Sequence, residues 1–203
     1  LVRPARSASN IHGKSGLGAS LDLYARGTPS DKNGADFIIE MARKYTGKLE
    51  ILSLGPLTDV ALALEKAPEI ANAIACVTVM GGGIHAGNAT RYAEFNIVAD
   101  PEAASVVFSS GVKTVMIGLD ATNLCYQPRS DIELLRAPTE LGKIVPAMLS
   151  SYADVYRQVH NIDGMMIHDA ICAVYLWRPE LFTCMKCRMT VCLEDGEHLG
   201  QTI

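Results

Sequence analysis

Residues 49–83, LEILSLGPLTDVALALEKAPEIANAIACVTVMGGG, contain a strand pattern, a helix pattern and a second strand pattern in succession. LEILSLG (residues 49–55) is typical of a buried strand, and residues 55–68 predict a helix that ends at Pro68. ACVTVMGGG (residues 75–83) predicts a second strand, rich in valine, that runs into three glycines. This order predicts a β-α-β unit.

The flanking segments extend the alternation. DKNGADFIIEMARKYTG (residues 31–47) predicts a helix with one apolar face, formed by Phe37, Ile38, Met41 and Tyr45. Residues 100–111 predict another helix, in which Asp100 caps the N-terminus and Pro101 lies in the first turn. The sequence therefore predicts one helix before the β-α-β unit and one after it.

KTVMIGLD (residues 113–120) is typical of a further buried strand. Strands that alternate with helices predict an α/β fold with a mostly parallel central sheet and helices on both faces. Ligands bind beyond the carboxyl ends of the strands in such folds. We therefore expect the functional site at residues 54–55, 81–96 and 119–123.

The second half of the chain carries two more helix patterns and a strand-like tail. Residues 139–161 predict a long helix that Pro146 is expected to bend, and residues 168–181 predict another. The tail, residues 182–203, is typical of two strands around a turn at residues 194–196. Because no repeat or linker interrupts the sequence, we treat residues 1–203 as one domain.

Composition narrows the class of protein. The chain has 203 residues, 49% of them hydrophobic and 20% charged, which is typical of a soluble globular protein. The net charge of −4 offers no basic stripe for nucleic acid and no polybasic run for a membrane surface. Its apolar runs are shorter than the roughly 20 residues that span a bilayer. We expect neither nucleic acid nor membrane as a partner.

The six cysteines favour a reduced, cytoplasmic protein, because several of them lie in apolar segments. Cys184 and Cys187 have the spacing of half a zinc site or a redox pair, but no second pair completes it. A strand with incidental cysteines is the favoured interpretation.

The glycines at residues 81–83 allow a second alternative. Gly81 to Ala86 fits the G-x-G-x-x-A fingerprint of dinucleotide-binding proteins. In that fingerprint the glycines open a helix directly, whereas here a polar loop of about ten residues follows. A dinucleotide-binding oxidoreductase is therefore the less favoured hypothesis.

Two groups of polar residues are candidates for chemistry. Asn88, Glu94 and Asn96 lie in a loop after the second strand, and Glu94 and Asn96 would project to the same side if the loop were extended. His168 and Asp169 stand together at the start of a helix. The simplest interpretation of each group alone is structural: a loop that satisfies its own backbone, and an aspartate that caps a helix.

Taken together, these motifs resemble the inosine-uridine preferring nucleoside hydrolases. The resemblance rests on VTVMGGG, GN, AEFNIVADPEAA, GLDATN and HDA in this order, and on NIHGKSGLG and GPLTDVALAL nearer the N-terminus. It extends over nearly the whole chain. It implies a Rossmann-like nucleoside hydrolase fold and calcium-assisted hydrolysis of the N-glycosidic bond of ribonucleosides, which releases ribose and the free base.

The resemblance also implies roles for particular residues. Asp169 and the Leu54 carbonyl match calcium ligands, and oxygen ligands suit this hard cation. Asn88 and Glu94 match residues that hold the 5′-hydroxyl of the ribose, Asn96 matches one that reaches the 2′-hydroxyl, and Met80 lines the sugar. His168 matches the imidazole that protonates the departing base. His12 is a weaker candidate for a place near the base.

The sequence departs from the family pattern at both ends. The aspartate-rich D-x-D-x-x-x-D-D segment, which supplies the general base and most calcium ligands, has no counterpart here. We therefore expect that the chain is a fragment lacking this motif and the C-terminal end, and that residues 1–203 alone bind calcium poorly and are inactive. A degenerate homologue that binds ribosides without catalysis is the main alternative. We also expect a cytoplasmic homo-oligomer that acts in nucleoside salvage on inosine, uridine or pyrimidine nucleosides.

Overall fold

The computed structural model describes residues 3–13, 16 and 28–203. These residues fall into two units: unit 1 holds those within 1–5, 30–123 and 168–203, and unit 2 holds those within 6–29 and 124–167. Part of the NIHGKSGLG motif, residues 14, 15, 17 and 18, lies outside the described residues.

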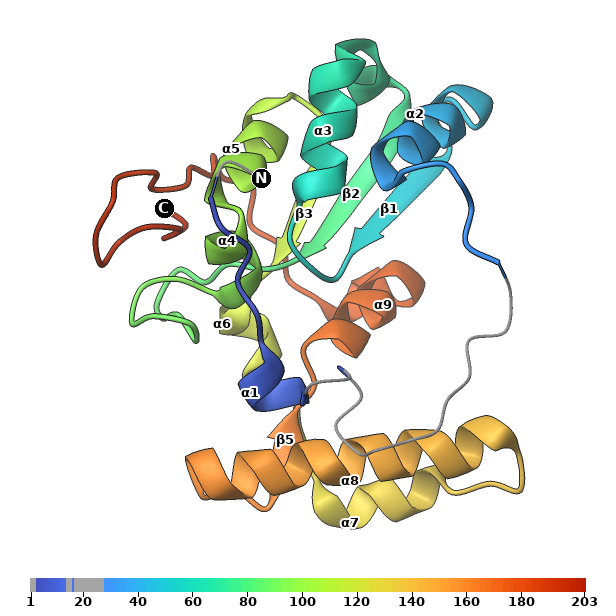
Figure 1. Ribbon diagram of the computed structural model, residues 1–203, viewed down its shortest axis with the longest axis vertical. Coiled ribbons are helices and arrows are strands. Elements are labelled where there is room, and N and C mark those ends of the chain that lie inside the picture. Colours follow the sequence, from blue (N-terminus) through green and yellow to red (C-terminus); the bar gives the residue numbers. More distant parts are fainter. Residues whose placement is uncertain (1–2, 14–15, 17–27) are drawn as a thin grey trace. The chain divides into compact units, whose positions relative to one another are not determined.

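Unit 1 is built on a three-stranded parallel sheet with the order β1-β2-β3 (Figure 1). The strands are β1 (Leu49–Ser53), β2 (Ile74–Met80) and β3 (Thr114–Ile117). Met80, the last residue of β2, is paired with Ile117, the last residue of β3. The predicted α/β fold with a parallel sheet is confirmed, and the carboxyl ends of the strands lie at one edge.

Helices cover both faces of this sheet, as predicted (Figure 1). Val77 and Val79 of β2 are fully buried against α2 (Gly34–Lys44), α3 (Thr58–Lys66) and α5 (Pro101–Ser109). Met80 packs on the opposite face with Cys172 of α9 (Asp169–Trp177). The two faces follow from the alternation of side chains along a strand.

The apolar face predicted for helix α2 is wrong in part. Its buried side chains are Ala35, Ile39 and Ala42, whereas Phe37 and Tyr45 are about half exposed, at 52% and 46%. A Cβ on Gly34 would lie 2.7 Å from an Asp59 carboxylate oxygen. Helices α2 and α3 therefore approach closely, and small side chains rather than aromatic rings fill their contact.

The start of helix α5 is as predicted. Asp100 Oδ1 accepts a hydrogen bond from the backbone N–H of Ala103 at 3.2 Å, and Pro101 is the first helical residue. Asp100 is buried, and its other oxygen, Oδ2, accepts from the Thr58 hydroxyl at 2.6 Å. The cap thus also ties α5 to the first residue of α3.

The other elements of unit 1 are short: η1 (Pro68–Asn72), α4 (Phe95–Ala99), α6 (Leu119–Thr122) and η3 (Pro179–Leu181). The two strands predicted for the tail are reduced to one antiparallel bridge between Val191 and Thr202. Thr190 and Ile203 exchange two backbone hydrogen bonds of 2.9 Å beside it. The tail therefore pairs with itself as predicted, but over a much shorter length.

Unit 2 is dominated by the long helix α8 (Glu140–His160). Thr139 caps its start, Asn161 ends it in a left-handed conformation with φ of 55°, and the helix continues through Pro146. The unit also contains an antiparallel pair of short strands, β4 (Tyr126–Pro128) and β5 (Gly164–Met166). Its short helices are α1 (Ser9–His12), α7 (Arg129–Ile132) and η2 (Glu133–Leu135). No helix among the described residues is both long enough and apolar enough to cross a membrane.

Candidate active site

Strands β1 and β2 of the unit 1 sheet each lead at the carboxyl end into a segment that carries candidate site residues. Unit 1 contains seven of the eight: Leu54, Met80, Asn88, Glu94, Asn96, His168 and Asp169. The eighth, His12, belongs to unit 2, where its ring stacks on Tyr152 with centroids 5.4 Å apart. The seven define the candidate site described below.

The glycines after β2 shape the backbone of this site. Gly82 has a φ of +75°, and a Cβ there would lie 2.7 Å from the sulfur of Met116. Glycine is therefore required both by the backbone conformation and by the lack of space. These glycines do not open a helix, because the next helix in the chain, α4, begins at Phe95. The local structure thus gives no support to the dinucleotide-binding hypothesis.

Glu94 is the most deeply buried carboxylate of the site, with 2% of its surface exposed. Its Oε2 accepts hydrogen bonds of 3.1 Å from the backbone N–H groups of Gly82 and Ile97. Burial raises the pKa of Glu94, the backbone donors oppose that shift, and the charge of Asp169 reinforces it. The carboxylate is thus fixed through one oxygen by the glycine segment and by the helix that it caps.

The expectation that Glu94 and Asn96 share one side of an extended loop is wrong. Glu94 is the N-cap of α4, and Asn96 lies inside that helix. Asn96 Nδ2 donates to the Met80 carbonyl at 3.0 Å and reaches the Leu54 carbonyl at 3.5 Å. The helix forms because the Glu94 side chain satisfies the Ile97 N–H at its start.

Asn88 is held by the same helix start. Its Oδ1 accepts a hydrogen bond of 2.8 Å from the backbone N–H of Phe95. The two amides are therefore held in opposite senses, Asn88 through its oxygen and Asn96 through its nitrogen. Asn88 can present its NH₂ group as a donor, and Asn96 can present its oxygen as an acceptor.

His168 lies at the residue before helix α9 and contacts a buried hydroxyl. Its Nδ1 is 2.8 Å from Oγ1 of Thr122, the last residue of α6. Burial lowers the pKa of the His168 imidazole. Asp169 is exposed and is the first residue of α9 rather than its N-cap, so the interpretation of Asp169 as a simple capping residue is wrong.

Sequence reasoning missed three side chains that fix the site from neighbouring segments. Asp120 accepts hydrogen bonds from the backbone N–H groups of Ile84 (2.7 Å) and His85 (3.1 Å), and its Oδ1 lies 2.7 Å from His85 Nδ1. Partial burial opposes the charge of Asp120, but these donors outweigh it and lower the pKa of the carboxyl.

The other two missed residues are Thr202 and Thr122. Thr202 exchanges two 3.0 Å hydrogen bonds with the backbone of Gly83, and Thr122 contacts His168 as described above. The GLDATN motif contains both Asp120 and Thr122, so the motif itself was the available signal.

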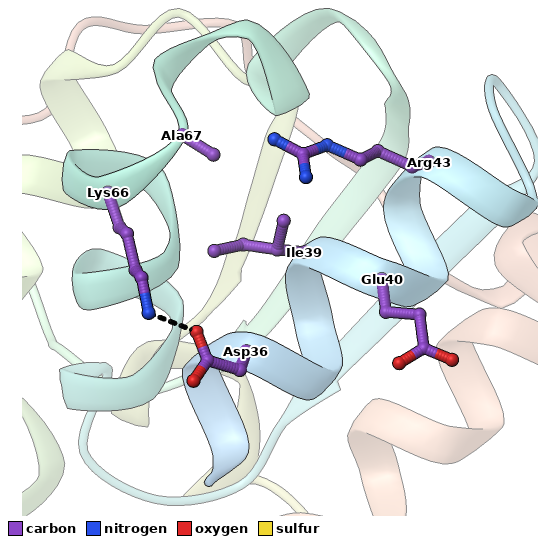
Figure 2. A pocket seen from close by; sticks show the side chains of 6 residues that line it. All are labelled: Asp36, Ile39, Glu40, Arg43, Lys66 and Ala67. Atoms are coloured by element: carbon purple, nitrogen blue, oxygen red, sulfur yellow. Dashed lines mark hydrogen bonds and ion pairs between the residues drawn. The ribbon is translucent and has the colours of Figure 1, made fainter. Parts of the chain in front are cut away.

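A hollow of about 400 Å³ lies elsewhere in unit 1, on the outer side of helices α2 and α3 (Figure 2). It is lined by Asp36, Ile39, Glu40, Arg43, Lys66 and Ala67, and the Lys66 ammonium is paired with Asp36 (Figure 2). None of the candidate site residues contributes to it. We interpret it as a solvated groove between two surface helices.

The described residues do not bring together three or more His, Cys, Asp or Glu side chains in a group suited to a metal ion. The exposed Cys184 and Cys187 belong to no such group within this part of the chain. Asp169 and the Leu54 carbonyl offer oxygen ligands of the kind that calcium prefers, but calcium takes about 6 to 8. The described residues therefore match calcium in ligand type and fall short in number.

The fold and the site define an α/β protein whose polar side chains gather where the strands of a parallel sheet end. The chain belongs to the inosine-uridine preferring nucleoside hydrolase family, whose family model matches residues 1–203. It is 36% identical, over its full length, to a non-specific ribonucleoside hydrolase, RihC, of Escherichia coli. It is also 36% identical over 92% of its length to a pyrimidine-specific ribonucleoside hydrolase, RihA, of Salmonella newport. The chain spans 66% and 60% of the length of these two relatives.

Solved structures give the same assignment. A plant nucleoside hydrolase superposes with a TM-score of 0.92 at 32% identity, covering 97% of this chain and 62% of the plant protein. A purine-preferring ribonucleoside hydrolase from Gardnerella vaginalis superposes with a TM-score of 0.87 at 33% identity, covering 96% of this chain and 62% of its own. These proteins share the fold of the chain described here.

Proposed function

We propose that the protein hydrolyses the N-glycosidic bond of ribonucleosides and releases ribose and the free base. Family membership supports this reaction class. The observation in the structure that favours it most is the fixed arrangement of Glu94, Asn96 and Asn88, which presents acceptors and a donor suited to sugar hydroxyls. The relatives named above differ in base preference, so we propose a broad preference that includes inosine and uridine.

In this proposal the ribose is held through its hydroxyl groups. Asn88 and Glu94 hold the 5′-hydroxyl, Asn96 accepts from the 2′-hydroxyl, and Met80 packs against the sugar. Backbone groups already engage one end of each polar side chain, so substrate meets groups that are fixed before it binds. Such preorganisation lowers the entropic cost of orienting the reactants.

The chemistry requires a proton for the leaving base. As the glycosidic bond breaks, the ribosyl group develops positive charge and the base develops negative charge. We propose that His168 gives its proton to the base as a general acid, a role that typically accelerates a reaction about 10²- to 10⁴-fold. Because burial lowers the pKa of His168, its protonated form is a stronger acid than an exposed imidazolium.

We also propose that calcium assists the reaction, with Asp169 and the Leu54 carbonyl among its ligands. When bound, calcium would hold the ribose hydroxyls and the attacking water. The remaining ligands would be water, substrate and residues outside the described part of the chain. Cytoplasmic location, a role in nucleoside salvage and assembly into a homo-oligomer belong to the same proposal and stay predictions.

The test is release of ribose from inosine and uridine by the protein as its gene encodes it. We expect turnover by the wild type and a loss of about 10- to 100-fold in kcat/KM for Asn96→Ala, since one charge-neutral hydroxyl contact and its preorganisation are lost. Asn72→Ala, at an exposed asparagine of η1, is the matched control and should retain activity. Binding of ribonucleosides without ribose release would instead favour the degenerate homologue.

A further inference from the structure

We propose that Thr122 is a positioning residue, which orients the His168 imidazole for transfer of its proton to the leaving base. The inference rests on the proposed function, because it assigns Thr122 a role through His168. It concerns a residue to which neither the sequence motifs nor the family resemblance gave a role.

The geometry joins two segments that are far apart in the sequence. Thr122 Oγ1 lies 2.8 Å from His168 Nδ1, and the two residues are 46 positions apart in the chain. Thr122 ends helix α6, which follows strand β3 at the sheet edge, and its own N–H donates to the Gly118 carbonyl at 3.1 Å. The hydroxyl is thus carried by backbone that is fixed to the sheet.

Because Thr122 is buried, its hydroxyl requires a hydrogen-bond partner inside the protein. Thr122 has no exposed surface, and a buried hydroxyl is unfavourable unless it is hydrogen-bonded. Valine has nearly the same shape and would fill the position without a polar atom. The threonine side chain also has restricted rotation about χ1, which holds Oγ1 in place.

The contact fixes the direction of the imidazole. The two nitrogens lie on opposite sides of the ring, so a hydrogen bond at Nδ1 sets where Nε2 points. The backbone of His168 is held as well, since its carbonyl lies 3.8 Å from the Cys172 sulfur one turn into α9. Displacement of a reacting group by about 1 Å can reduce a rate about 100-fold.

A hydroxyl in this place differs from the carboxylate that orients histidine in many hydrolases. A carboxylate would fix the ring and also add a negative charge beside it. Thr122 fixes the ring without adding charge. The proposal therefore predicts a defect in orientation when the hydroxyl is removed, and this defect should depend on how much the leaving group needs a proton.

The experiment compares two substrates in the protein as its gene encodes it. Inosine needs its base protonated, whereas 4-nitrophenyl β-D-ribofuranoside has a leaving group that departs without a proton. For Thr122→Val we expect kcat on inosine to fall about 10- to 100-fold with KM changed less than about threefold, and kcat on the nitrophenyl riboside to change less than about threefold. His168→Ala should show the same selectivity, and Thr122→Ser should restore most activity on inosine.

Further variants separate positioning from a structural role. Thr78→Val removes another fully buried threonine hydroxyl from unit 1 and should leave the ratio of the two substrates unchanged. Because Thr122 acts through His168, the double variant Thr122→Val/His168→Ala should be no less active than His168→Ala alone.

Two results would overturn the role of Thr122. The first is a loss of kcat in Thr122→Val that is equal on both substrates. The second is a loss of kcat on inosine in Thr122→Ser that is as large as the loss in Thr122→Val. Failure of the proposed function has a different signature, which is a wild type that releases ribose from neither substrate, and it would remove the role of Thr122 as well. If His168→Ala loses activity selectively on inosine while Thr122→Val does not, the proposed function stands and only the Thr122 inference fails.

Discussion

Glu94 shows how one side chain serves both the fold and the candidate site. It starts helix α4, anchors the glycine segment and places a carboxylate within the electrostatic reach of Asp169. A buried carboxylate with fixed donors on one oxygen resists rotation, which suits a group that holds a sugar hydroxyl. The same burial disfavours its charged form.

This burial predicts a dependence of stability on pH. Because the folded pKa of Glu94 is raised above its ordinary value of 4.5, its contribution to stability is fully present below that value and is lost as pH rises through the folded pKa. We expect the free energy of unfolding to fall less over this range in Glu94→Gln than in the wild type. Urea unfolding at a series of pH values measures the difference.

The control for the Glu94 experiment is Glu65→Gln, which removes a carboxylate from an exposed position of helix α3. It corrects for the change in net charge alone. Parallel pH profiles for the wild type and Glu94→Gln would contradict the prediction.

At the level of elements, the turn after β2 depends on Gly82 for two reasons that can be separated. Gly47 and Gly82 have nearly the same left-handed backbone, with φ of +73° and +75°. A Cβ on Gly47 would meet nothing within 4 Å, whereas one on Gly82 would lie 2.7 Å from the Met116 sulfur and 3.0 Å from Thr202 Cγ2. The pair therefore separates backbone strain from steric exclusion.

We expect Gly47→Ala to lower the free energy of unfolding by about 1 to 2 kcal/mol through backbone strain alone. Gly82→Ala should lose roughly a further 1 to 3 kcal/mol, because the side chains of Met116 and Thr202 must shift to admit the methyl group. Urea unfolding of both variants gives the two values. Equal losses would show that the space around Gly82 has no influence on stability.

The order of elements from β1 to β3 could be predicted because the signals are local. Apolar runs of strand length, the cap at Asp100 and the stop at Pro68 each act within a few residues. Helix α4 was missed because its start depends on the Glu94 side chain, which sequence reasoning placed in a loop. The orientation of α2 was partly wrong because its close approach to α3 at Gly34 is a tertiary feature.

The sequence allowed the residues of the candidate site to be predicted, but not the hydrogen-bond partners that hold them. The motif positions located Glu94, Asn96 and His168, whose roles stay predictions. Their partners are Gly82 for Glu94, the Met80 carbonyl for Asn96 and Thr122 for His168. These pairs are 12, 16 and 46 residues apart, so only the folded sheet edge brings them together.

For the whole molecule, the calcium proposal predicts a stability that depends on the ion. A ligand that binds only the folded protein stabilises it by RT ln(1 + [L]/Kd), about 2.7 kcal/mol at 100 times Kd. In the protein as its gene encodes it, we expect the Tm to rise when calcium replaces a chelator. Asp169→Asn should lose most of this rise, because a carboxylate proposed as a calcium ligand loses its charge.

The matched control for calcium is Asp59→Asn. Asp59 and Asp169 are exposed aspartates in the first turn of nine-residue helices, α3 and α9, so both variants lose the same favourable interaction with a helix N-terminus. We expect Asp59→Asn to keep the full rise of Tm with calcium. Differential scanning calorimetry with calcium and with a chelator measures all three proteins. A wild type whose Tm ignores calcium, or an Asp169→Asn variant that responds as the wild type does, would contradict Asp169 as a calcium ligand.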